Sequence, residues 1–312
     1  MPDGATLAES YAQAKRVAKA QARNFYYGFR LLPAEKHAAL CALYAFMRWV
    51  DDISDEPGEA AAKGRGMELA RDAVERAARG GEGGPVFLPA LADTLSRYRI
   101  PRGYLDELIA GAEMDLAGAS YRTFDELRLY CHRVAGIVGQ CCVHVFGFTD
   151  ARALELGDRL GLAFQLTNIL RDVAQDHALG RVYLPAEDLE RFAVRAEELP
   201  AAPPGKAARE LFRFQAERAR GFYEEGAALL PLVDEDSRAA LWALARIYGG
   251  LLGKMEAASY DVISKRVSLS ATEKTWILLR ARFGMWSEEN GFETHSDPGR
   301  GTGRAVVGSG SR

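Results

Sequence analysis

The sequence of 312 residues lacks a long hydrophobic run and lacks a marked excess of charge of either sign. The longest stretch without a charged side chain, Val134 to Thr149, has 16 residues. A membrane-spanning helix needs about 20 apolar residues, so we expect no transmembrane segment. The 40 lysines and arginines are balanced by 43 aspartates and glutamates. The resulting net charge of −3 creates no general attraction for a polyanion, so we expect no nucleic-acid partner.

The sequence is also poor in cysteine motifs. Its four cysteines lie in apolar surroundings without CxxC spacing, and the N-terminus has no basic-then-apolar leader. We therefore expect reduced thiols and a cytoplasmic location. Nucleotide-binding and hydrolase motifs of the types GxGxxG, P-loop, GxSxG and HExxH are absent as well. Their absence leaves no support for the chemistries that depend on them.

Alternating β-branched runs are scarce, whereas apolar residues recur at helical spacing through most of the chain. No linker separates two cores, so the pattern predicts one all-α domain over residues 1–286. Gly136 and Gly139 indicate close contact with a neighbouring helix. Residues 287–312 are rich in Gly, Ser, Thr and charge, which predicts a disordered tail. Long helices are predicted from Pro33 to just before Pro57, from Thr123 to about Phe146, from about Ala151 to Asp176, from Ala207 to about Leu230 and from Asp236 to about Ile263, with a last helix that ends near Phe283.

An acidic cluster follows an apolar helical run in the stretch YAFMRWVDDISDEPG. Asp51 and Asp55 are four residues apart, so on a helix they project from one face. Arg48 and Asp52 have the same spacing and could form a surface ion pair. Taken alone, the cluster is explained equally well by an exposed acidic helix end.

A second polar stripe favours a metal site over an exposed helix end. In QLTNILRDVAQD, the spacings of three, four and four place Gln165, Asn168, Asp172 and Asp176 on one face of a helix that is otherwise apolar. Two acidic stripes that face each other would bind hard divalent cations, for which we expect Mg²⁺, with Mn²⁺ as a substitute. Without a cation, such closely spaced carboxylates would repel one another and their pKa values would rise.

These segments resemble the squalene/phytoene synthase family, which joins two prenyl diphosphates head to head. The resemblance runs from about Asn24 to Arg266, through NFYYGFRLLP, ALYAFMRWVDDISDE, YCHRVAGIVG, FQLTNILRDVAQDHALGRVYLP and YDVISKR. It implies a helical bundle with a central cavity. It also implies that Mg²⁺ and substrate diphosphate bind at Asp51, Asp55, Asn168, Asp172 and Asp176, with Arg48 and Arg171 beside them.

Further candidate residues come partly from this resemblance and partly from the chemistry of a carbocation. Tyr44, Tyr130 and Tyr248 lie on apolar faces, where a tyrosine more often serves packing; the resemblance raises Tyr130 to a catalytic candidate and the other two to substrate contacts. Aromatic rings attract a cation. The remaining candidates for substrate binding are Asn24, Phe25, Phe29, Gln165 and Arg266, with Tyr26, Phe164, Arg181, Tyr183 and Lys265 as further wall or closing residues.

The expected reaction is the condensation of two farnesyl diphosphates to presqualene diphosphate or a squalene-type product. NFYYGFRLLP and YCHRVAGIVG are more similar to bacterial enzymes of squalene supply, and the bulky Phe25 and Phe29 could shorten the cavity. Phytoene synthesis from geranylgeranyl diphosphate is the alternative, and NADPH is expected only if the reaction proceeds to squalene. Expected partners are the prenyl diphosphates, downstream isoprenoid enzymes and a membrane surface that receives the product.

Two other classes remain open at this stage. Terpene cyclases and prenyl chain-elongating enzymes also use aspartate-rich helices with Mg²⁺. A helical assembly factor without catalytic activity could share the fold, although it would not need both aspartate pairs.

One segment departs from the family pattern. Ala22 and Asn24 occupy positions where family members often carry serines that contact a diphosphate. The diphosphate contacts of this segment are therefore expected to differ from those of the family.

Overall fold

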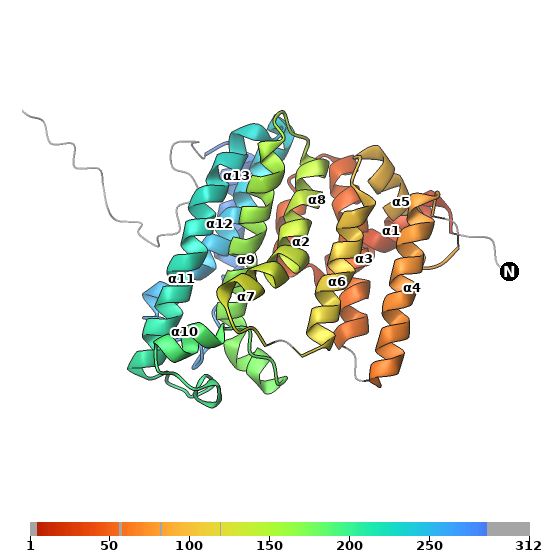
Figure 1. The fold of residues 1–312 in the computed structure, drawn as a ribbon. Coiled ribbons are helices and arrows are strands. Elements are labelled where there is room, and N and C mark those ends of the chain that lie inside the picture. Colours follow the sequence, from red (N-terminus) through yellow and green to blue (C-terminus); the bar gives the residue numbers. More distant parts are fainter. Residues whose placement is uncertain (1–4, 56–57, 82, 119, 286–312) are drawn as a thin grey trace, which may run out of the picture.

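The structure, a computed structural model, describes residues 5–55, 58–81, 83–118 and 120–285 (Figure 1). These residues form helices and connecting loops, and pair as strands only at two isolated bridges, Ser120 with Val182 and Phe148 with Val233. The predicted all-α class is therefore confirmed. The helices are α1 (Leu7–Gln21), α2 (Arg23–Phe29), α3 (Ala34–Asp55), α4 (Ala60–Ala78), α5 (Leu88–Arg97), α6 (Arg102–Leu116), α7 (Phe124–Cys131), α8 (Ile137–Phe146), α9 (Arg152–Ala178), α10 (Ala186–Arg191), α11 (Lys206–Gly226), α12 (Glu235–Ala257) and α13 (Ala271–Arg282), with a π-helical turn η1 (His132–Gly136) and 3-10 turns η2 (Ala196–Glu198) and η3 (Ala227–Leu232).

Most predicted helix ends agree with the structure, but two segments differ. The segment from Thr123 to Phe146 is not one α-helix, because the π turn η1 separates α7 from α8. The helix predicted to reach Ile263 ends at Ala257 instead. Ser259 and Tyr260 adopt positive φ angles of 50° and 57°, which reverse the chain and leave YDVISKR outside the helix. The predicted tail from residue 287 lies outside the described residues.

The helices surround a central space (Figure 1). In Figure 1, α3 and α6 stand on one side of this space and α9 and α12 on the other, with α2 and α8 between them. The C-terminal ends of α3, α6 and α9 all lie at the lower side of the view. Acidic residues near these three ends are therefore brought to the same side of the bundle.

Glycines allow two central helices to approach closely, as the sequence indicated for Gly136 and Gly139. A Cβ atom added at Gly139 would lie 2.1 Å from the carbonyl oxygen of Gly157 on α9. A Cβ atom at Gly161 would lie 2.2 Å from the carbonyl oxygen of Ala135. The backbones of α8 and α9 are thus nearly in contact, which fixes the wall of the central space. None of the helices that the structure describes is long and apolar enough to cross a membrane.

Candidate active site

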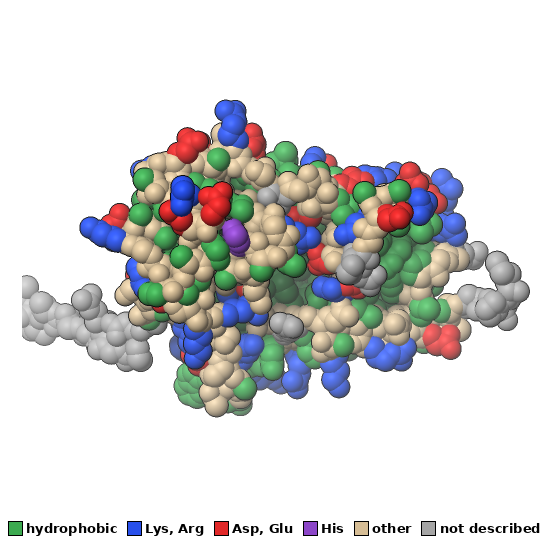
Figure 2. Space-filling model, turned by 90° about the horizontal axis from the view of Figure 1, so that it is seen from below, with side chains coloured by type: hydrophobic (Ala, Val, Ile, Leu, Met, Phe, Trp, Pro, Cys, Tyr) green, Lys and Arg blue, Asp and Glu red, His purple; other side chains and the backbone are tan. Residues whose placement is uncertain are grey.

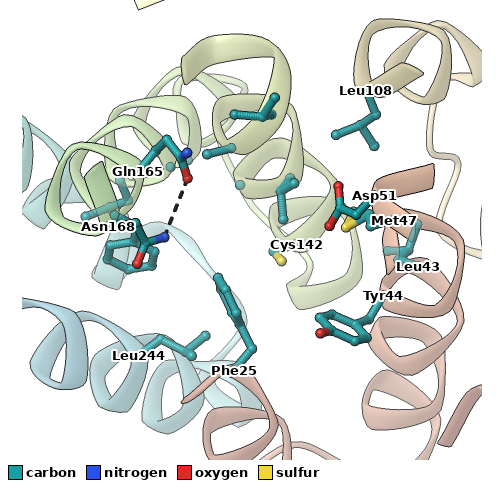
Figure 3. A pocket seen from close by; sticks show the side chains of 18 of the residues that line it. Phe25, Leu43, Tyr44, Met47, Asp51, Leu108, Cys142, Gln165, Asn168 and Leu244 are labelled. Carbon is teal, nitrogen blue, oxygen red and sulfur yellow. Dashed lines mark hydrogen bonds between the residues drawn. The ribbon is translucent and has the colours of Figure 1, made fainter. Parts of the chain in front are cut away.

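A cavity of about 340 Å³ lies between α2, α3, α6, α8, α9 and α12. Seen from below, the molecular surface is hollowed near its middle, with hydrophobic side chains inside and acidic and basic side chains at the rim (Figure 2). Figure 3 shows Asp51 and Tyr44 projecting from α3 toward the side where Gln165 and Asn168 extend from α9. The apolar lining includes Phe25, Phe29, Leu43, Met47, Leu108, Val138, Cys142, Phe164 and Leu244.

The first aspartate pair lies on the last turns of α3, where both carboxylates line the cavity. Asp51 is accessible from the cavity, yet protein surrounds it on its other sides. This burial raises the pKa of Asp51 to about 7; Arg48 opposes the rise, and the neighbouring charges of Asp55 and Asp115 add to it. Asp55 accepts a hydrogen bond of 3.1 Å from Arg181 Nη2. One carboxylate of the pair is thus ion-paired, and the other forms no ion pair with a described residue.

The second pair continues the polar face of α9 beyond the cavity. Gln165 and Asn168 line the cavity, and Asn168 Nδ2 lies 3.5 Å from Gln165 Oε1 (Figure 3). Asp172 and Asp176 follow one and two turns later. Asp176 lines a small adjoining hollow together with Arg181 and Tyr183, which also line the main cavity. The predicted stripe is therefore present, and it extends from the cavity to its rim.

The two carboxylates of this second pair have opposite electrostatic environments. Asp172 accepts hydrogen bonds from Arg171 Nε at 3.0 Å and from Arg266 Nε at 2.8 Å. Burial acts to raise the pKa of Asp172, but these guanidinium groups outweigh it and lower the pKa. For Asp176, burial and the nearby Asp172 charge raise the pKa to about 7, although Arg181 opposes them. Each aspartate pair therefore contains one neutralised carboxylate and one that is costly to ionise.

Arg48, predicted to bind diphosphate, is paired with Asp52 one turn later on α3. The predicted pair of these two residues is therefore present. The Nε atom of Arg48 is buried and has no hydrogen-bond partner among the described residues. The guanidinium group thus retains one N–H donor that no described residue uses.

A fifth carboxylate, Asp115 at the end of α6, was not among the residues predicted from the sequence. It lines the cavity and accepts hydrogen bonds from the hydroxyls of Tyr130 at 3.0 Å and Tyr183 at 2.8 Å. Burial raises the pKa of Asp115, and these two hydrogen bonds oppose the rise. Its charge contributes to the raised pKa values of both Asp51 and Asp176, so it lies between the two pairs. Leu108 and Ala112 precede Asp115 at helical spacing on α6 and line the same cavity.

Aromatic rings form much of the wall on the side of α2. Phe25 and Phe29 share one face of α2 with their ring centroids 6.3 Å apart, and both line the cavity, as predicted. Phe164 of α9 also lines the cavity and stacks on Tyr248 at 4.4 Å, and the ring of Phe25 lies 5.4 Å from that of Tyr248. Tyr248 itself is buried behind these rings and is not among the residues that line the cavity, so its contact with substrate stays a prediction. Asn24 lies on α2 but does not line the cavity either.

No three Asp, Glu, His or Cys side chains converge tightly enough to bind one metal ion among the residues that the structure describes. Two histidines near the cavity, His132 and His144, have other contacts. His132 Nδ1 lies 2.6 Å from Asp158 Oδ1, and His144 Nδ1 lies 3.2 Å from the carbonyl oxygen of Tyr98. Carboxylates of the aspartate pairs and the amide oxygen of Asn168 are therefore the groups on this face that could supply ligands to a metal.

The fold and the site together define a class of protein. Helices enclose an apolar cavity, and carboxylates and guanidinium groups gather at its rim. This arrangement suits a ligand with a long apolar chain and an anionic head group. Residues 18–273 match the sequence model of the squalene/phytoene synthase family, and the chain belongs to that family.

Known proteins with high similarity carry names from this family. The phytoene synthase of Mycobacterium tuberculosis is 39% identical over 280 residues, which cover 88% of this chain and 91% of that protein. The phytoene synthase of Arthrospira platensis is 36% identical over 298 residues, which cover 89% of this chain and 95% of that protein. Both matches agree with the family that the motifs indicated.

Solved structures of squalene-type synthases have the same fold as this chain. A dehydrosqualene synthase in complex with a ligand has a TM-score of 0.82 at 27% identity and covers 89% of this chain and 97% of that chain. The squalene synthase of Alicyclobacillus acidocaldarius has a TM-score of 0.75 at 26% identity and covers 82% and 96%. The helical isoprenoid synthase fold and an enzyme that transfers prenyl groups are thereby confirmed. These findings favour the enzyme over the assembly factor.

Proposed function

We propose that this enzyme condenses two molecules of geranylgeranyl diphosphate head to head and forms phytoene through prephytoene diphosphate. The sequence motifs alone favoured farnesyl diphosphate. The relatives shift the choice, since the proteins named phytoene synthase are 36% and 39% identical, whereas the solved squalene-type synthases are 26% and 27% identical. The observation that carries the reaction type is the apolar cavity with carboxylates and guanidinium groups at its rim.

The residues at the rim fit Mg²⁺. Asn168 Oδ1 is buried and has no hydrogen-bond partner among the described residues, so it is available as an oxygen ligand. The raised pKa values of Asp51 and Asp176 indicate unneutralised negative charge that a divalent cation would balance. Mg²⁺ usually takes only one or two protein carboxylates and completes its coordination with water and phosphate oxygens. Two pairs on separate helices therefore suit it better than a compact cluster of four.

In this proposal the arginines hold the diphosphates. Arg181 and Arg266 are paired with Asp55 and Asp172 in the structure, at 3.1 and 2.8 Å. A diphosphate at the rim offers these guanidinium groups a more highly charged partner that they can bind in a bidentate manner. When bound, Mg²⁺ supplies positive charge that stabilises the departing diphosphate. Arg48 and Arg171 would add to that stabilisation from the same rim.

The aromatic residues of the cavity wall would stabilise the carbocation that the reaction forms and keep water away from it. Breaking the C1–O bond of the first substrate leaves an allylic cation, which the C2–C3 double bond of the second substrate attacks. Loss of a proton then closes the cyclopropane ring. Loss of the second diphosphate, rearrangement and loss of another proton give phytoene, with no reductant. The rings of Phe25, Phe164 and Tyr44 stabilise the cation and exclude water. Tyr130 and Tyr183, both held by Asp115, border the point where the head groups enter.

Condensation of farnesyl diphosphate to a squalene-type product is the second candidate. Phe25 and Phe29 narrow the cavity on the side of α2, and the solved structures with the same fold are squalene-type synthases. This branch needs NADPH only if the product is squalene.

Product analysis after incubation with each diphosphate tests the proposal. Purified enzyme with Mg²⁺ is given farnesyl or geranylgeranyl diphosphate, with and without NADPH, and the hydrocarbons are identified by mass. Phytoene from the longer substrate without NADPH is expected, and EDTA should abolish it. A higher kcat/KM for farnesyl diphosphate would transfer the assignment to the second candidate. Inertness toward both substrates would refute both.

A further inference from the structure

Hydrophobic side chains gather on the outer face of α13. Four of the nine large hydrophobic side chains that the described residues expose lie within residues 276–285. Trp276, Leu279 and Phe283 form one stripe, because they are spaced by three and four residues. They are 58%, 45% and 72% exposed, and Met285, which follows the end of α13, is 54% exposed. Such concentration on one helix marks an interaction surface, whereas the other exposed hydrophobic residues are scattered singly. We call these four residues the α13 stripe.

The helix that carries the α13 stripe is firmly attached to the bundle. A capping box between Ser270 and Glu273 begins α13, and Lys254 of α12 bonds to Glu273 at 2.7 Å. At the other end, Ala281 is buried and Arg280 lies 5.7 Å from the ring of Trp242. The stripe is therefore presented outward by a helix whose opposite face is packed against α12 and α2.

The charge beside the stripe is positive. Arg280 and Arg282 lie next to residues of the stripe, whereas Lys274 lies over the ring of Tyr27 on the packed side of α13. The single carboxylate on α13, Glu273, is already paired with Lys254. A second copy of the chain that docked symmetrically on this face would bring these cations toward their own counterparts. An anionic lipid surface attracts them, and the rings of Trp276 and Phe283 suit the boundary between head groups and acyl chains.

We propose that α13 is a docking face for an anionic lipid bilayer, with its axis in the membrane plane and the α13 stripe in the head-group region. The face lies one helix layer from the cavity, because α13 packs on α2 and α12, which contribute Phe25 and Leu244 to the cavity wall. The use of this face rests on the proposed function, whose hydrocarbon product dissolves in lipid and not in water. Binding to the bilayer itself does not depend on that function.

Vesicle flotation without substrate tests the docking face. The full-length protein is mixed with vesicles of phosphatidylcholine alone or of phosphatidylcholine with phosphatidylglycerol, at low and high salt. We expect binding to the anionic vesicles, weakened by salt. The triple variant Trp276→Ser/Leu279→Ser/Phe283→Ser should reduce the partition coefficient by about tenfold or more. A matched control, Leu69→Ser/Val86→Ser/Leu129→Ser, removes three exposed hydrophobic side chains elsewhere and should bind like the wild type. Arg282→Glu should weaken binding to anionic vesicles only.

Each alternative result contradicts the docking face. Failure of the wild type to float with anionic vesicles overturns it, as does equal binding by the α13 triple variant. A wild-type dimer that the triple variant converts to a monomer, with no vesicle binding by either, would assign the face to a second copy. Circular dichroism and turnover with detergent-dispersed substrate verify that the triple variant is folded. A protein that floats but makes no hydrocarbon would refute the proposed function and leave the docking face intact.

Discussion

The two carboxylates of the second aspartate pair should have opposite effects on stability. Asp176→Asn removes a charge whose pKa burial and Asp172 raise from 3.8 to about 7. Each pKa unit corresponds to about 1.4 kcal/mol, so this rise sets an upper limit of about 4 kcal/mol. Relaxation of the partly accessible site reduces it, and we expect a gain of about 1–2 kcal/mol in the free energy of unfolding at pH 8.5. Asp172→Asn should instead lose about 1–2 kcal/mol, because it leaves the guanidinium of Arg171 without its charged partner. Both variants should lose activity.

The pH dependence separates this account from a packing effect. Because the pKa of Asp176 is higher in the folded state, the unfolded chain releases this proton first, and ionisation destabilises the fold as pH rises from 3.8 to about 7. Above pH 7 the cost is constant. The advantage of Asp176→Asn should therefore shrink by about half between pH 8.5 and 5.5. Denaturant unfolding with EDTA present at both pH values measures it. An advantage that is absent at pH 8.5, or equal at both pH values, would refute the assigned cause.

Further predictions concern the first pair, the cavity and the helix contact. Asp51→Asn should lower kcat by at least about 100-fold with an unchanged helical spectrum, whereas Asp52→Asn should do much less; equal losses would mean that the wrong face of α3 was chosen. Phe29→Ala, which removes a buried ring at a cost of about 3–5 kcal/mol, should raise the ratio of kcat/KM for geranylgeranyl over farnesyl diphosphate; a folded variant with an unchanged ratio would make Phe29 a packing residue. Gly139→Ala places a Cβ atom 2.1 Å from a backbone oxygen and should lower the free energy of unfolding by at least about 1–3 kcal/mol. The control Gly103→Ala, whose Cβ atom would have nothing within 4 Å, should not lower it. Equal unfolding midpoints for the two variants would contradict the close helix contact.

Much of the fold was predictable because helical periodicity and breaking residues are local signals. The apolar run before Asp51 and the polar stripe from Gln165 to Asp176 fall on α3 and α9 as expected. The π turn at His132–Gly136 and the early end of α12 were not predictable in this way. Both depend on contacts with other helices or on positive φ angles at Ser259 and Tyr260, residues that do not usually favour them.

The candidate site was predictable where it consists of repeated spacing and not where it depends on tertiary approach. Asp115 has no partner at helical spacing in its own segment, and only the fold brings it to Tyr130 and Tyr183. The ion-pair partners of the aspartates could not be predicted from the sequence for the same reason. Arg181, for example, binds Asp55 although 126 residues of sequence separate them. Tyr248 shows the reverse case, since its residue type suited the wall but packing places it behind Phe164.

The joining of two substrate molecules in one cavity is tested most directly by isotope mixing. Purified enzyme with Mg²⁺ is given equal amounts of unlabelled and fully deuterated geranylgeranyl diphosphate, and the hydrocarbon product is analysed by mass spectrometry. Head-to-head condensation predicts light, mixed and heavy phytoene, with the mixed form most abundant. A product in only two masses, each derived from a single substrate molecule, would instead identify a cyclase and contradict the account.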